Sequence, residues 1–94
     1  MTESDIEKAF VQFADSVGCQ ALKLRLDGQN GWPDRTLVTP RGIFFAEFKS
    51  AKGRLRPMQK VWISALESMG YVVITPKRPG EAEDFLRRWL DEDV

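Results

Sequence analysis

The sequence predicts an α/β domain in which a mixed sheet is flanked by helices. Apolar residues recur at helical spacing in three segments, and they alternate or form short runs, as in strands, in four others. Along the chain the order is helix, three strands, helix, strand, helix, or αβββαβα. With 94 residues the chain has the length of one domain, spanning 1–94. Its 43% hydrophobic and 30% charged residues are typical of a folded soluble protein.

The first helix is predicted from a capping pattern and an apolar stripe. Ser4 is the expected N-cap, and Glu7, three residues later, would complete a capping box. The apolar positions that follow at helical spacing are Ile6, Phe10, Phe13 and Val17. Gly18 then predicts the end of the helix.

Three strands are expected next. Leucines alternate with Lys23 and Arg25 over residues 22–26, which predicts a strand with one apolar face. A loop rich in Gly, Asn and Pro follows over residues 27–33. Residues 36–38 and 43–49 flank the turn sequence TPRG, so we expect them to pair as antiparallel strands.

The second half of the chain predicts a helix, a strand and a closing helix. Pro57 begins a helix that Gly70 ends, and its apolar stripe consists of Met58, Val61, Trp62, Ala65, Leu66 and Met69. Residues 71–75, YVVIT, are nearly all apolar, which predicts a strand buried on both faces and parallel to residues 43–49. The closing helix has its apolar residues at Ala82, Phe85, Leu86, Trp89 and Leu90.

Composition excludes several kinds of chemistry. The chain has no histidine and one cysteine, Cys19, so it offers no Cys/His zinc site, no internal disulfide and no imidazole base. We expect no organic cofactor. No apolar run approaches the roughly 20 residues of a membrane helix, and the N-terminus carries acids where a signal peptide carries lysines. A cytoplasmic location is therefore expected.

Charge is balanced overall but uneven along the chain. There are 14 basic and 14 acidic residues, yet residues 48–66 contain five cations and no acid: Lys49, Lys52, Arg54, Arg56 and Lys60. A basic patch of this kind suits a phosphate backbone. A solvated basic loop is the alternative interpretation.

An acid, a second acid and a lysine are predicted to meet at one end of the antiparallel pair. Glu47 and Lys49 lie two positions apart and so share a face of their strand. Asp34 begins the strand that pairs back on them, which places its carboxylate beside Glu47. Two neighbouring carboxylates repel each other unless a cation or a proton intervenes. Mg²⁺ prefers oxygen ligands and takes one or two protein carboxylates, so it is the expected partner.

Lys49 and Phe48 complete this hypothesis. An unperturbed lysine, with a pKa of about 10.4, is a poor base at neutral pH. We therefore expect Lys49 to align and stabilise a hydroxide that the metal generates. The backbone carbonyl of Phe48, between the two charged residues, is a further oxygen ligand in this interpretation.

Three stretches resemble the VRR-NUC domain, a compact branch of the PD-(D/E)xK nuclease superfamily. They are GWPD, FFAEFK and GRLRPMQKVWISALESMGYVVI, and the resemblance extends over about residues 3–75. It implies the PD-(D/E)xK restriction-endonuclease-like core and the activity of a structure-selective DNA nuclease dependent on Mg²⁺ or Mn²⁺. Small stand-alone members from phages and bacteria act as homodimers that resolve four-way (Holliday) junctions.

The resemblance also assigns roles to residues. Asp34 and Glu47 correspond to the metal ligands, Lys49 to the catalytic lysine, and Gln59 to a glutamine that supports the site. Glu7 corresponds to a helical acid that completes the metal site. The resemblance places Lys23, Gly31, Trp32 and Arg54 around the DNA, and the basic patch adds Lys52 and Arg56 as expected phosphate contacts.

Several assignments have alternatives. Glu7 is also explained as a capping residue, in which case Glu3 is the candidate helical ligand. Gly31 either supplies a positive φ angle or allows DNA to come close. Trp32 either stacks on a nucleotide or seals a dimer contact, and Gln59 could be ordinary helix surface.

The sequence thus predicts a metal-dependent endonuclease for branched DNA, specifically a homodimeric four-way junction resolvase. A flap or restriction-type nuclease is the alternative from the same chemistry. A non-catalytic DNA-binding protein that keeps the fold is the alternative from a different class.

Overall fold

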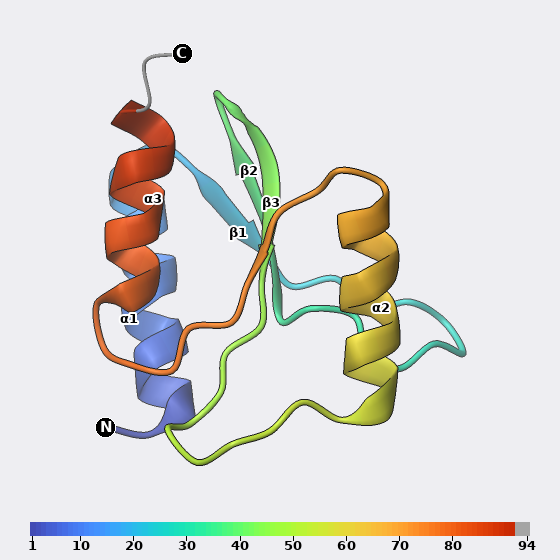
Figure 1. Cartoon of the computed structure of the whole chain (residues 1–94). Helices are drawn as coiled ribbons and strands as arrows, with labels where there is room; N and C mark the ends of the chain where they lie inside the picture. Colours follow the sequence, from blue (N-terminus) through green and yellow to red (C-terminus); the bar gives the residue numbers. More distant parts are fainter. Residues whose placement is uncertain (92–94) are drawn as a thin grey trace.

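A four-stranded mixed sheet lies between helices in the computed structural model, which describes residues 1–91 (Figure 1). The elements of this part of the chain are α1 (Glu3–Ser16), β1 (Gln20–Leu22), β2 (Arg35–Thr39), β3 (Gly42–Ala46), α2 (Pro57–Ser68), β4 (Val73–Ile74) and α3 (Glu81–Asp91). This is the predicted αβββαβα order. Figure 1 shows α1 and α3 on one side of the sheet and α2 on the other.

The sheet has the order β1-β2-β3-β4. The first three strands are antiparallel neighbours, and β4 is parallel to β3. Beyond β3 the chain stays alongside the β4 segment, because the Glu47 N–H donates to the Ile74 carbonyl at 2.9 Å and the Lys49 N–H donates to the Pro76 carbonyl at 3.1 Å. Glu47 and Lys49 are therefore fixed by backbone hydrogen bonds on the β4 side.

The face toward α1 and α3 holds the main core. Leu37, Phe44, Ala46 and Phe48 are fully buried there. Residues of both helices join the cluster, and the rings of Phe10 and Phe48 lie 5.6 Å apart. Full burial of such side chains stabilises the fold by about 1.5–3 kcal/mol each relative to exposure.

The face toward α2 is built from aromatic rings and polar groups. Trp32 packs edge-on against Phe45 at 5.4 Å and against Trp62 at 5.1 Å. Its indole N–H donates to the Thr36 hydroxyl at 3.3 Å. Trp62, a member of the predicted apolar stripe, is only partly buried and makes a half-buried contact on this face.

The start of α1 differs from the prediction. Its N-cap is Thr2, whose hydroxyl accepts from the Asp5 N–H at 3.1 Å, while the Asp5 carboxylate accepts from the Thr2 N–H at 3.0 Å. Ser4 was therefore the wrong cap. The same spacing of a hydroxyl and an acid occurs two residues earlier, and the helix begins there. Glu7 has no part in this cap.

The first strand is shorter than predicted and begins earlier. β1 covers Gln20–Leu22, and the predicted strand residues Lys23 to Leu26 are outside the sheet. The reason is the partner strand, since Leu22 pairs with Thr36 and β2 begins at Arg35. Pro33, with no N–H to donate, lies in the segment that residues 23–26 would have to pair with.

Residues 71–75 form an edge of the sheet instead of a strand buried on both faces. β4 pairs with β3 alone, and Tyr71 and Val72 are exposed. Part of the apolar stripe of α2 is exposed as well, at Met58, Val61 and Met69. The apolar pattern correctly predicted the existence of helix α2 and strand β4. It did not show which of their apolar side chains are buried and which are exposed.

None of the helices within residues 1–91 has the length and apolar character needed to cross a bilayer.

Candidate active site

Asp34 and Glu47 meet at one end of the β2–β3 hairpin. Asp34 directly precedes β2 and Glu47 directly follows β3, and the pairing of Arg35 with Ala46 places both at the same end. The Asp34 N–H donates to Glu47 Oε1 at 3.1 Å, and the Phe48 N–H donates to Asp34 Oδ2 at 2.9 Å. The predicted proximity of the two carboxylates is what the structure shows.

Lys49 and Gln59 both contact the second oxygen of Glu47. Lys49 Nζ lies 3.3 Å from Glu47 Oε2, and Gln59 Nε2 donates to the same oxygen at 2.7 Å. Gln59 is buried, with 6% exposure, so it is not ordinary helix surface. Its own Oε1 accepts from the Arg56 N–H at 2.7 Å at the start of α2. Gln59 therefore links the orientation of Glu47 to the position of that helix.

The two carboxylates are held in an electrostatically unfavourable environment. Burial, together with the charge of Asp34, raises the pKa of Glu47 to about 7 although Lys49 opposes the change. Burial also raises the pKa of Asp34; the hydrogen bond from Phe48 partly offsets this, and the negative charges of Glu7 and Glu3 add to it. A cation between the two carboxylates would relieve this repulsion.

The helical acids near the pair already have partners. Glu7 Oε2 lies 2.7 Å from Arg35 Nε and 4.0 Å from Lys23 Nζ. Glu3 Oε2 accepts from the Ser50 N–H at 3.2 Å. Both acids therefore already have a polar partner next to the Asp34–Glu47 pair.

The donor set suits a hard divalent ion. Within residues 1–91 no three His, Cys, Asp or Glu side chains are grouped closely enough to form a metal site by themselves. Asp34 and Glu47 nevertheless present two carboxylates side by side, and Mg²⁺ commonly uses one or two, with water and phosphate oxygens as its other ligands. The residues present therefore fit a magnesium or manganese ion that is completed by substrate.

Gly31 and Trp32 have structural roles in this loop. Gly31 has a φ of +88°, and a Cβ there would lie 2.5 Å from the backbone of Met58. The space beside Gly31 is thus filled by the start of α2 rather than open to DNA, and the positive-φ alternative is the one supported. The Trp32 ring packs against Phe45 and Trp62, so these contacts explain its position with no need for a nucleotide.

The cations expected around the DNA fall into two groups on either side of the carboxylates. Lys23 and Arg56 line a cavity of about 740 Å³ together with Asp34. Lys52 and Arg54 line a second cavity, of about 640 Å³, together with Lys49. The sequence grouped Arg56 with Lys52 and Arg54 because they are close along the chain, whereas the fold separates them.

Two further lysines line the second cavity: Lys60 of α2 and Lys77, which follows β4. Lys60 was placed in the basic patch by sequence but not in the site, and Lys77 was missed. The predicted parallel pairing of residues 43–49 with residues 71–75 could have revealed Lys77. In the structure the Lys49 N–H donates to the carbonyl of Pro76, and Lys77 is the next residue.

Comparisons with known proteins bear on the fold. No family model matches the sequence, and no curated protein matches it. A solved structure described as "VRR_NUC domain" is similar, with a TM-score of 0.82 and 22% sequence identity over 93% of this chain and 97% of that one. At this identity the similarity establishes architecture. The chain therefore has the VRR-NUC fold, as the three sequence stretches predicted.

Proposed function

We propose that the protein is a Mg²⁺- or Mn²⁺-dependent endodeoxyribonuclease that cuts branched DNA. The main support is that Asp34, Glu47 and Lys49 lie together at one end of the hairpin. Gln59 of α2 orients Glu47 by a hydrogen bond to its carboxylate. Nothing in a purely structural domain requires a buried acid, Glu47, and a partly buried one, Asp34, to be placed together at a net electrostatic cost.

Each residue has a distinct role in the proposed hydrolysis. Asp34 and Glu47 would hold the metal, with the Phe48 carbonyl as a further ligand and Glu7 or Glu3 as the helical acid. Such an ion would supply polarisation of the phosphodiester and a water molecule of lowered pKa. The Lys49 ammonium orients and stabilises the attacking oxygen. Gln59 is a positioning residue, because it acts through Glu47.

The DNA backbone in this proposal crosses the carboxylates between two sets of cations. Lys23 and Arg56 lie on the Asp34 side, and Lys52 and Arg54 lie on the Lys49 side. Phosphate contacts of this kind position DNA without reading its sequence, in keeping with a nuclease that selects structure. Gly31 and Trp32 contribute by shaping the loop that presents Asp34.

A four-way junction is the proposed substrate and a homodimer the proposed active form. Symmetric cutting of a junction needs two active sites, and each chain has one. Support for pairing comes from the α2 side of the molecule, where apolar side chains are exposed at Val38, Ile43, Met58, Val61, Met69 and Tyr71. We place the protein in the cytoplasm of a bacterial or phage-infected cell, where such DNA occurs.

Cleavage of a synthetic four-way junction in Mg²⁺ tests the proposal. Lys49→Ala and Asp34→Ala should each lower the rate by about 10²-fold or more, since a positioned proton-transfer or charge-stabilising group typically contributes that much. The exposed hairpin residue Arg41, substituted by Gln, is the control expected to cleave like the wild type. Full activity of both alanine variants would contradict the assignment.

Substrate choice separates the alternatives. Preference for a flap or a plain duplex over the junction would favour a flap or restriction-type nuclease. DNA binding without cleavage, together with no divalent-ion binding in calorimetry, would favour a non-catalytic DNA-binding protein.

A further inference from the structure

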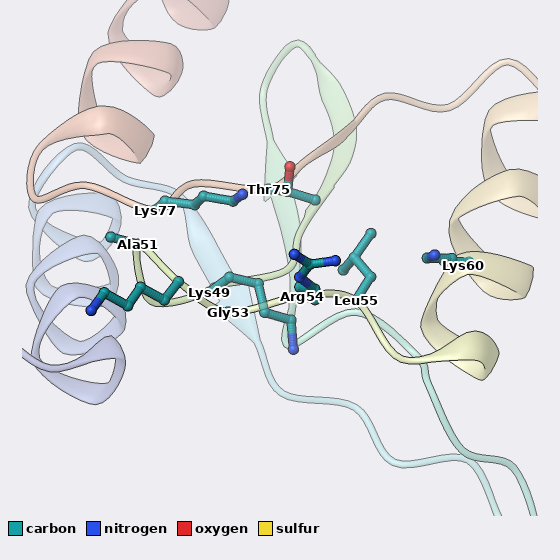
Figure 2. A pocket seen from close by; sticks show the side chains of 9 residues that line it. Lys49, Ala51, Gly53, Arg54, Leu55, Lys60, Thr75 and Lys77 are labelled. Atoms are coloured by element: carbon teal, nitrogen blue, oxygen red, sulfur yellow. The ribbon is translucent and has the colours of Figure 1, made fainter.

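A basic cavity opens on the Lys49 side of the carboxylates. Figure 2 shows the side chains that line it. The cavity has a volume of about 640 Å³, and its charged lining residues are all cations: Lys49, Lys52, Arg54, Lys60 and Lys77. We call it the basic cavity. Its size lies within the range of ordinary ligand sites.

The charge of the basic cavity is not explained by composition. The chain has as many acidic as basic residues, yet none of the described residues that line the cavity is acidic. The cations come from three separate segments, namely the loop after β3, helix α2 and the loop after β4, and Figure 2 shows Lys60 and Lys77 entering from different elements. Like charges gathered by the fold repel one another, and an anion between them relieves the repulsion.

The backbone around the basic cavity is held in place. The Lys49 N–H donates to Pro76, and the Gly53 N–H donates to the Ser50 carbonyl at 2.9 Å. The Lys77 N–H donates to Glu81 Oε1 at 2.9 Å, at the start of α3. Lys60 belongs to the first half of α2. The lysines are therefore presented by fixed positions, unlike those of a freely solvated loop.

Lys49 joins the basic cavity to the carboxylates. Its Nζ lies 3.3 Å from Glu47 Oε2, and the same side chain lines the cavity. A strand whose phosphate is positioned at Asp34 and Glu47 and which continues past Lys49 would place its next phosphate in the basic cavity.

We propose that the basic cavity binds the phosphodiester adjacent to the one that is cut, and that Lys60 and Lys77 contact it. This inference rests on the proposed nuclease function for the identity of the ligand. It extends that function by adding two contact residues from α2 and from the loop after β4. These contacts fix the direction in which the bound strand leaves the site.

Metal-free DNA binding tests the proposal without requiring cleavage. The affinity of a labelled four-way junction is measured in EDTA over a series of salt concentrations for the wild type, Lys60→Gln, Lys77→Gln and the double variant. Each phosphate contact contributes about 0.9 to the slope of log affinity against log salt, and both lysines contact one phosphodiester, so the double variant should lower the slope by about 1 per bound chain and each single variant by a smaller amount. Affinity at a fixed moderate salt concentration should fall several-fold for each lysine.

Two controls isolate the effect. Arg41→Gln removes an exposed cation at the hairpin turn, at the opposite end of β2 and β3 from the carboxylates, and should leave slope and affinity unchanged. Lys60→Arg and Lys77→Arg keep the charge and should keep the wild-type slope. Circular dichroism and thermal unfolding verify that each variant is folded.

The outcomes separate this inference from the proposed function. If the lysine variants bind like the wild type with an unchanged slope, the basic cavity is not a phosphate site. The same conclusion follows if the wild type binds no DNA. If the slopes fall as expected but the wild type cleaves nothing in Mg²⁺, the basic cavity binds phosphate and the nuclease proposal fails instead.

Discussion

The two faces of the sheet differ in what they bury. On the face toward α1 and α3, Leu37, Phe44 and Phe48 are enclosed in an apolar core. On the face toward α2, the neighbouring strand positions hold Thr36, Phe45 and then Glu47, and a glutamine from the helix meets a buried carboxylate. One face stabilises the fold, while the other contains a buried acid that costs stability.

This difference separates folding from the proposed chemistry. Within residues 1–91, two helices cover the first face and α2 alone lies over the second (Figure 1). Cavities lined by α2 residues open beside the second face. Sites that need charged groups held close together commonly cost stability, which the rest of the molecule must supply. Removing a buried apolar side chain from the first face should therefore destabilise the fold strongly, whereas removing a charge from the acid pair on the second face should stabilise it.

The largest effect is expected on the apolar face. Phe44→Ala removes a fully buried ring and should lower the free energy of unfolding by about 3–5 kcal/mol. Ile43→Ala, one residue earlier on the opposite face and 41% exposed, should cost about 1 kcal/mol or less. Urea unfolding of both variants measures the contrast. Equal losses would mean that the two faces are not divided in this way.

The next effect concerns pH and arises on the α2 face. Glu47 has a pKa of about 7 in the folded protein against a model value of 4.5, so the folded state holds a proton that the unfolded state releases between these values. The stabilisation of the folded state by this proton is fully present below pH 4.5 and is lost as the pH rises to about 7. The loss in the free energy of unfolding is up to about 3 kcal/mol. Asp34, whose pKa is also raised, acts in the same direction.

Urea unfolding in EDTA at pH 5 and at pH 8 measures this loss. The metal-free protein should be less stable at pH 8. Equal or greater stability at pH 8 would show that burial and mutual repulsion do not raise the pKa values of the two carboxylates.

A smaller effect of opposite sign is expected from Asp34→Asn. The amide oxygen can still accept from the Phe48 N–H, but the charge that repels Glu47 is removed. The metal-free protein at pH 8 should become more stable by about 1 kcal/mol, while junction cleavage is lost. Asp15→Asn, at an exposed position near the end of α1 and outside both cavities, is the matched control and should change neither quantity. Destabilisation by Asp34→Asn would contradict the account.

Local spacing was sufficient to predict the centre of the site. The separation of two between Glu47 and Lys49, and the turn that returns Asp34 to them, fix which side chains share a face and an end of the hairpin. The resemblance added Gln59, whose burial and bond to Glu47 agree with a supporting position. The sheet, the helix order and the parallel β3–β4 pair followed from periodicity and connection rules.

The remainder depended on tertiary partners that spacing does not encode. Leucines at residues 22–26 have strand period, but β1 ends where its partner ends. The fold alone brings Arg35 to Glu7, which is 28 residues away in the sequence. It also brings Lys77 to the cavity that Lys49 lines. The exposed apolar residues of α2 have the same helical spacing as buried ones. Spacing shows which face of a helix is apolar, but not whether another part of the protein covers that face.

Calorimetric titration of Mn²⁺ or Mg²⁺ into the wild-type protein and into Asp34→Asn tests the central claim most directly, namely that Asp34 and Glu47 are placed together to hold a divalent cation. The account predicts saturable binding at about one or two ions per chain for the wild type, strengthened by junction DNA, and loss of that binding in the variant. No binding by the wild type with DNA present, or equal binding by both proteins, would contradict it.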